Sequence, residues 1–114
     1  MDKTVLKKHQ PILILSGSSG RVFVNGEDKS ADGSPPAKLH PMTPDHFIKA
    51  VYVLDGKDNV VYYEELPLEG GQGEAKSKTF NAPPGATLTP YQFCNKHGLW
   101  EGKAVKSESG GGEL

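Results

Sequence analysis

The sequence contains a single cysteine and no long hydrophobic run. Because Cys94 is the only cysteine among 114 residues, no disulfide can form within the chain. The longest apolar run, Pro11–Leu15, is far shorter than the roughly 20 residues of a membrane-spanning helix and too short for a signal-peptide core. We therefore expect a soluble, cytoplasmic protein whose free thiol has a function.

An excess of charge of either sign is also lacking. Thirteen lysines and arginines nearly balance 14 aspartates and glutamates, which gives a formal net charge of -1. The basic footprint of a nucleic-acid-binding protein is therefore missing, and we expect neither a nucleic-acid partner nor a membrane partner. The length suits one domain. We predict this domain over residues 1–106, followed by a flexible, polar, glycine-rich tail over residues 107–114.

Helical periodicity is the third absence. Fourteen glycines and nine prolines interrupt the chain, and no window has an apolar stripe of period 3.6. Short β-rich runs alternate with turn residues, which is typical of an all-β sandwich of about seven strands. Pro90 lies inside one run, where its missing N–H predicts an edge strand or a bulge beside Cys94. The predicted strands are Pro11–Leu15, Arg21–Val24, Phe47–Leu54, Asn59–Leu66, Glu74–Phe80, Thr87–Phe93 and Gly102–Val105.

The four histidines all lie in predicted turns or at strand ends. His40 and His46 enclose two prolines, which restrict the backbone and reduce the entropy lost when a metal binds. Cys94 and His97 are separated by two residues, so that a tight turn can direct both toward one ion. His9 precedes the first predicted strand. A single histidine more often has an ordinary polar role, but the two paired motifs together indicate a transition-metal site.

The residues alone leave the identity of the metal open. One thiolate with several imidazoles suits iron, copper or zinc. A structural zinc site takes four ligands and would leave one histidine over. A blue copper site uses an axial methionine soon after its last histidine, and no methionine follows His97. An iron with four imidazoles and one axial thiolate would keep one face open for a small oxidant.

Three motifs resemble those of the superoxide reductase family, the iron domain that neelaredoxins and desulfoferrodoxins share. Residues 7–11, 40–48 and 94–100 are similar to its Glu-Lys-His-x-Pro, His-Pro-x-x-x-x-His-x-Ile and Cys-Asn-x-His-Gly-Leu-Trp patterns. The resemblance implies an immunoglobulin-like β-sandwich. It also implies an oxidoreductase that reduces superoxide to hydrogen peroxide by one electron, in antioxidant defence.

The resemblance further implies a mononuclear non-haem iron, one per chain, with four equatorial histidines and an axial cysteine. The implied ligands are His9, His40, His46, His97 and Cys94. Backbone amides of Asn95 and Lys96 are expected to donate hydrogen bonds to the cysteine sulfur. Lys8 is the implied catalytic residue, because it is the charged group of the family's site that this chain retains.

Two departures from the family's pattern refine these expectations. The family's short domain with a four-cysteine iron site has no counterpart, so the resemblance points to the one-iron class. Lys7 replaces the glutamate that can occupy the sixth position of the oxidised iron, and we expect no protein carboxylate there.

The partners that the resemblance implies are superoxide as the substrate and a small electron-transfer protein such as rubredoxin as the donor. By analogy with one-iron relatives, we expect a homotetramer, otherwise a homodimer. Two other functions stay open, a cupredoxin-like electron carrier and a non-catalytic immunoglobulin-like binding module. Metal content and the visible spectrum would separate the three.

We predict that Lys8→Ala slows the bimolecular reaction with superoxide and flattens its dependence on salt, since a positive charge beside His9 steers an anion to the iron. Electrostatic steering raises association rates by about 10- to 1,000-fold, and one lysine should supply the lower end of that range. Pulse radiolysis at several ionic strengths measures the effect, with iron content unchanged and Lys7→Ala as the comparison. A wild-type rate for Lys8→Ala at low salt would reject the steering role.

Overall fold

The computed structural model describes residues 9–27, 35–36, 38–66 and 74–107. These ranges contain eight β-strands and no helix, and therefore no helix that could cross a membrane. The strands are β1 (Pro11–Ser16), β2 (Ser19–Val24), β3 (Ile48–Leu54), β4 (Val60–Glu65), β5 (Phe80–Asn81), β6 (Thr87–Cys94), β7 (Gly98–Glu101) and β8 (Val105–Lys106). The prediction of an all-β chain is confirmed.

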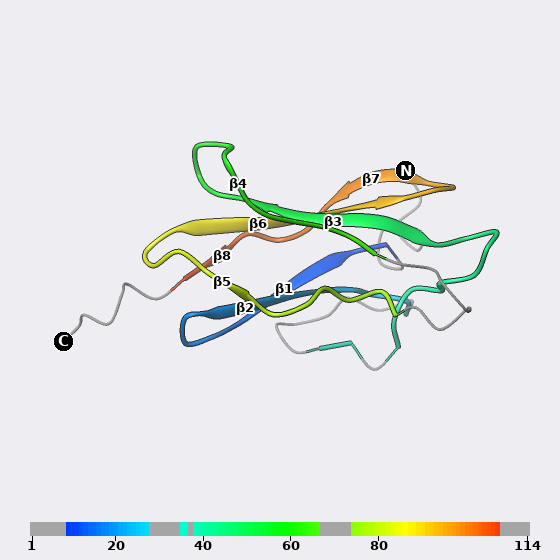
Figure 1. Cartoon of the computed structure of the whole chain (residues 1–114), viewed down its shortest axis with the longest axis horizontal. Coiled ribbons are helices and arrows are strands. Elements are labelled where there is room, and N and C mark those ends of the chain that lie inside the picture. Colours follow the sequence, from blue (N-terminus) through cyan, green and yellow to red (C-terminus); the bar gives the residue numbers. More distant parts are fainter. Residues whose placement is uncertain (1–8, 28–34, 37, 67–73, 108–114) are drawn as a thin grey trace.

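The strands form two antiparallel sheets that face each other as the layers of a sandwich (Figure 1). One sheet has the order β1-β2-β5, and the other has the order β4-β3-β6-β7 with β8 also paired to β6. Tight turns make the hairpins: Gly17, with φ 60°, lies between β1 and β2, and Asp58, with φ 65°, lies between β3 and β4. Glycine adopts this left-handed conformation without steric cost, whereas aspartate tolerates it better than most residues.

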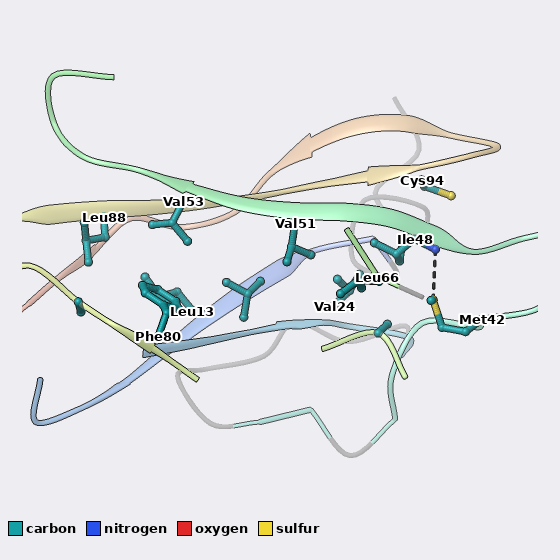
Figure 2. Packing of buried hydrophobic residues seen from close by; sticks show 13 residues of the cluster. Leu13, Val24, Met42, Ile48, Val51, Val53, Leu66, Phe80, Leu88 and Cys94 are labelled. Carbon is teal, nitrogen blue, oxygen red and sulfur yellow. Dashed lines mark hydrogen bonds between the residues drawn. The ribbon is translucent and has the colours of Figure 1, made fainter. Parts of the chain in front are cut away.

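The core lies between the sheets because alternate side chains of each strand point inward. In β6 the buried positions are Leu88, Pro90, Gln92 and Cys94. Cys94 lies at one end of the hydrophobic cluster, near Met42 and Ile48 (Figure 2). The buried cluster consists of Leu13, Val22, Val24, Met42, Ile48, Val51, Val53, Leu66, Ala75, Phe80, Ala82, Leu88 and Cys94.

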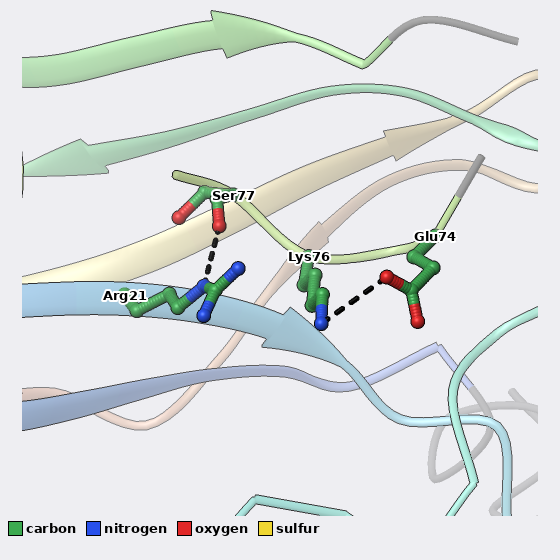
Figure 3. A network of polar contacts seen from close by, with 4 residues as sticks. All are labelled: Arg21, Glu74, Lys76 and Ser77. Atoms are coloured by element: carbon green, nitrogen blue, oxygen red, sulfur yellow. Dashed lines mark hydrogen bonds and ion pairs between the residues drawn. The ribbon is translucent and has the colours of Figure 1, made fainter. Parts of the chain in front are cut away.

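The predicted strand Glu74–Phe80 is wrong over most of its length, because only Phe80 belongs to a strand, β5. The segment nevertheless runs beside β2. Ser77 donates its N–H to the carbonyl of Val22 at 2.8 Å and accepts the N–H of Val22 on its hydroxyl at 2.9 Å. Arg21 donates its Nε to the Ser77 carbonyl at 2.7 Å, and Lys76 pairs with Glu74 at 3.2 Å (Figure 3). A serine side chain thus replaces one rung of the backbone ladder.

The region after Cys94 also differs from the prediction. Gly98–Glu101 forms β7, which the sequence did not reveal, and the predicted strand Gly102–Val105 is a connection until β8 begins. Gly102 donates its N–H to the Pro90 carbonyl at 2.8 Å. A side chain at Gly102 would lie 2.1 Å from the Pro11 carbonyl oxygen. This close approach of two backbones leaves room only for glycine at position 102.

Pro90 lies in the central strand β6, so its predicted edge position is wrong. β3 pairs with β6 along one side, with Val53 opposite Pro90. On the other side β7 pairs with residues 91–94 and β8 with residues 87–88. Pro90 therefore falls in the gap between β7 and β8. A register shift between Ile48 and Ala50 of β3 lies opposite the end of β6, which places the irregularity beside Cys94.

The described fold continues one residue past the predicted domain boundary. Ser107 is buried, donates its N–H to the Ala86 carbonyl at 2.8 Å and accepts the Ala86 N–H on its hydroxyl at 2.9 Å. The rest of the predicted tail, residues 108–114, lies outside the described residues.

Leu88→Ala should lower the free energy of unfolding by about 2 to 5 kcal/mol, because Leu88 is fully buried and its removal leaves a cavity between the sheets. Val60 is 61% exposed on β4, and Val60→Ala should change stability by less than about 0.5 kcal/mol. Urea unfolding of the metal-free protein measures both. Equal losses in the two variants would contradict the packing described above.

Candidate metal centre

The pairing of β3 with β6 brings two of the predicted motifs together. Ile48, the first residue of β3, lies opposite Cys94, the last residue of β6. His46 precedes Ile48 by two residues, and the turn that carries His97 follows Cys94 directly. Both motifs therefore lie at the same end of the sandwich.

Asn95 links these two motifs by three hydrogen bonds. Its side-chain oxygen accepts the N–H of Phe47 at 2.8 Å, and its side-chain amide donates to the Asp45 carbonyl at 3.0 Å. The backbone N–H of Asn95 donates to the Phe47 carbonyl at 3.1 Å. The expected hydrogen bond from this N–H to the Cys94 sulfur is therefore not the arrangement found. Asn95 instead positions the neighbouring loop.

The loop from His40 to His46 is closed on itself. Thr43 and His46 exchange two backbone hydrogen bonds of 3.0 and 3.1 Å. Met42 is buried, and its sulfur accepts the N–H of Ile48 at 3.3 Å. At the other end of the loop, His40 donates its N–H to the Val24 carbonyl, where β2 ends, at 2.9 Å. These bonds fix both histidines relative to the two sheets.

His9 reaches the site from the beginning of β1. Its backbone carbonyl accepts a hydrogen bond of 2.8 Å from the side-chain amide of Gln92, 83 residues away in the chain. Its ring stacks on Trp100, with centroids 4.9 Å apart and an interplanar angle of 16°. The next residue, Gln10, accepts the Asn25 N–H at 2.9 Å. Both sheets therefore hold the segment that carries His9.

Five nitrogen and sulfur donors converge at this end of the sandwich. Ligand atoms of His9, His40, His46 and Cys94 lie within 4.8 Å of one another. His97 lies at the edge of this group, with its Nδ1 2.8 Å from Nε2 of His9 and 3.9 Å from Sγ of Cys94. The structure thus brings together the five residues that are predicted as metal ligands.

Burial differs across the cluster. His9 and His40 are each 3% exposed and Cys94 is fully buried, whereas His97 is exposed and His46 is half-buried. The side of the cluster formed by His46 and His97 therefore faces solvent, and the thiol lies behind it.

His40 is neutral, and its ring orientation is fixed by a hydrogen bond. Its Nδ1 lies 2.8 Å from the Pro41 carbonyl, and since a carbonyl can only accept, Nδ1 carries the proton. Nε2 then keeps its lone pair and lies 4.0 Å from the Cys94 sulfur. Burial lowers the pKa of His40 to about 4, against a weaker opposing effect of the Pro41 hydrogen bond. At neutral pH the ring therefore offers Nε2 to a metal, as histidine ligands with a backbone partner do.

His46 is also held in its neutral form. Burial lowers its pKa, and the positive charges of His97 and Lys96 lower it further. Its Nε2 is buried and has no hydrogen-bond partner among the described residues. A buried nitrogen without a partner is costly. Coordination of a metal ion would satisfy it.

The donor set therefore fits a single transition-metal ion. Nitrogen ligands lie about 2.1 Å from such an ion, so that ligands on opposite sides are about 4 Å apart. The spacing of up to 4.8 Å observed here needs only a small contraction. Imidazoles with one thiolate suit iron, copper and zinc and disfavour magnesium or calcium.

Two predicted residues of the site cannot be placed, and two unpredicted ones contact His9. Lys7 and Lys8 lie outside the described residues, so the expectations for them stay predictions. Sequence reasoning missed the contacts of Gln92 and Trp100 with His9. The available signal was a glutamine at an inward position of the strand Thr87–Cys94, two residues before the cysteine.

The sequence profile of one family, described as desulfoferrodoxin, matches residues 3–103 of the chain. No curated protein sequence matches the chain. The profile covers all five donors of the cluster and both strands that position them.

Several solved structures have a similar fold. A superoxide reductase from Treponema pallidum is 29% identical, with a TM-score of 0.65 over 90% of this chain and 71% of that one. Two others share the fold at lower identity. The reduced superoxide reductase (neelaredoxin) from Archaeoglobus fulgidus is 23% identical, with a TM-score of 0.63 over 89% of this chain and 90% of that one. The 1Fe superoxide reductase from Giardia intestinalis is 21% identical, with a TM-score of 0.61 over 86% and 96%. The prediction of an immunoglobulin-like sandwich is confirmed.

Cys94→Ser should abolish the sulfur-to-metal charge-transfer absorption and weaken metal binding, because a serine hydroxyl is not ionised at neutral pH and is a poor ligand for a soft site. His46→Ala should weaken binding but keep the absorption band. Reconstitution with Fe²⁺, air oxidation, visible spectroscopy and metal analysis measure both effects. Identical spectra of wild type and Cys94→Ser would show that the sulfur is not a ligand.

Proposed function

This chain belongs to the desulfoferrodoxin family, and on that premise we propose that it is a superoxide reductase with one iron held by five residues. The observation that carries the proposal is the convergence of three buried or half-buried histidines and the cysteine, with His97 beside them. The proposed ligands are His9, His40, His46, His97 and Cys94.

Iron, when bound, would supply one electron to superoxide, which takes up two protons to give hydrogen peroxide, and an external donor would then restore the ferrous state. The chain's own residues provide the setting for this chemistry. Neutral imidazoles at His40 and His46 and one thiolate would leave a ferrous ion with a net charge of about +1, which attracts a small anion.

Access to the site supports the same substrate. The exposed His97 and the half-buried His46 form the side of the cluster that solvent reaches, whereas Cys94 lies on the buried side. Lys96 is exposed and close enough to His46 to lower its pKa, so its positive charge adds to the attraction of an anion on the open side. The buried sulfur of Cys94 is shielded from oxidants dissolved in the solvent, which favours its role as a ligand.

The remaining expectations belong to the same proposal. The iron is of the one-iron class, the electron donor is a small redox protein such as rubredoxin, and the protein acts in the cytoplasm in antioxidant defence. We propose a homotetramer, otherwise a homodimer, by analogy with one-iron relatives. Lys8 is proposed to steer superoxide and to assist in proton delivery.

Family membership weighs against the two other functions considered. An electron carrier of the cupredoxin type would need a copper site, and three or four imidazoles with one thiolate exceed the two histidines of that site. A non-catalytic binding module would have no reason to hold the lone pair of His40 toward a buried cysteine.

The proposal predicts one-way reduction of superoxide. Iron-loaded protein should form one hydrogen peroxide per electron supplied and evolve no oxygen. A dismutase oxidises one superoxide to oxygen for each one that it reduces, whereas a reductase only reduces superoxide. Stopped-flow mixing with a peroxide assay and an oxygen electrode measures this balance. Cys94→Ser should lose the activity, and Val60→Ala, at an exposed strand position, should keep it. Oxygen evolution in proportion to superoxide consumed would contradict the proposal.

A further inference from the structure

We propose that Gln92 is a positioning residue of the metal centre, which holds the main chain at His9 so that the His9 ring is in place before a metal binds. The inference rests on the proposed metal site, but it concerns a residue outside the ligand set. Gln92 is fully buried in β6, two residues before Cys94. A buried amide is costly unless its hydrogen bonds are made, so its presence there calls for a function.

The hydrogen bond between Gln92 and His9 fixes which way the side-chain amide of Gln92 is oriented. Its Nε2 lies 2.8 Å from the backbone carbonyl of His9. Since that carbonyl can only accept, the amide must present its NH₂ group there. The Oε1 atom is buried and has no hydrogen-bond partner among the described residues. The side chain thus tolerates one unsatisfied atom to make the bond to His9, which indicates that this bond is the reason for a glutamine at this position.

Trp100 holds the other end of the same ligand. It is 6% exposed and stacks on the His9 ring at 4.9 Å. Gln92 and Trp100 are directly opposite each other in the ladder between β6 and β7, so that their side chains lie on the same face of the sheet. One pair of cross-strand neighbours therefore contacts His9 at two points, its carbonyl and its ring.

Like the other proposed ligands, His9 is positioned by a hydrogen bond to a distant part of the chain. The loop of His40 and His46 is bonded to Val24 at one end and to Asn95 at the other. The carbonyl of His9 is bonded to Gln92, which lies 83 residues further along the chain. Fixing the backbone of a residue costs conformational entropy. Because the bond to Gln92 orders the backbone at His9 in the metal-free protein, this entropy is not lost again when a metal binds.

The first test is Gln92→Met, which keeps the length and volume of the side chain but removes the amide. Zn²⁺ alone serves as a redox-silent probe that accepts the same nitrogen and sulfur ligands. Its affinity for the metal-free protein, measured by competition with a chromophoric chelator, should fall by about 10- to 100-fold, as for other residues that orient a metal ligand. Gln92→Asn, whose amide is one methylene too short, should give a similar loss and replaces Gln92→Met if that variant does not fold.

The matched control is Leu88→Ala, at another fully buried position on the same face of β6. This variant should lower the unfolding midpoint and leave Zn²⁺ affinity unchanged. If Leu88→Ala weakens Zn²⁺ binding as much as Gln92→Met, general destabilisation explains the loss and the positioning role is overturned.

A double-mutant cycle with His9→Ala decides whether Gln92 acts through His9. The proposal expects Gln92→Met to change Zn²⁺ affinity by less than about 2-fold once the His9 ring is absent, because the bond then has no ligand to position. The same loss with and without the His9 ring would overturn it. Wild-type protein that binds neither Zn²⁺ nor Fe²⁺ would overturn the proposed function itself, whereas tight binding that Gln92→Met leaves unchanged would overturn this inference alone.

Discussion

The hydrogen-bond ladder between β3 and β6 sets Ile48 opposite Cys94, and the geometry of the metal centre depends on this register. Side chains alternate between the two faces of a strand, so a slip of one residue would turn Cys94 away from the core and move His46 relative to the turn that follows. The side chain of Asn95 bonds to Asp45 and Phe47 on the neighbouring loop, and these bonds are compatible with one register only. The fold therefore defines the site through a strand pairing rather than through the metal.

Burial keeps the imidazole rings of His40 and His46 in their neutral form. The low pKa of His40 and the lowered pKa of His46 result mainly from desolvation, which disfavours a second positive charge beside a metal ion. Neutral rings are the form that binds metals. The cost is a cluster of polar groups packed against a hydrophobic core, and one nitrogen of His46 has no hydrogen-bond partner among the described residues. A bound cation would remove that cost, so the same burial that weakens the metal-free fold favours the metal-bound one.

The sequence indicated which residues cluster at the site, but it did not reveal the contacts that position them. Prolines, turns and ligand spacing are local properties, and they indicated the two paired motifs of His40 with His46 and Cys94 with His97. The resemblance to the superoxide reductase family implied the full set, which includes His9. Gln92 and Asn95 act across the chain, on His9 and Phe47, and no local pattern shows such a partner. The segment before Phe80 failed as a strand because the hydroxyl of Ser77 takes one rung of the ladder. Pro90 failed as an edge residue because β7 and β8 leave a gap beside it in a central strand.

The stacking of Trp100 on His9 has an optical consequence. Trp100 is the only tryptophan in the chain, so the long-wavelength emission of the protein comes from one indole ring 4.9 Å from an imidazole of the cluster. Indole emission is quenched by nearby protonated imidazole and by paramagnetic or coloured metal ions. The protein thus carries a fluorophore within its own metal centre, and loading, oxidation or loss of the ion can be followed in the ultraviolet without an added dye.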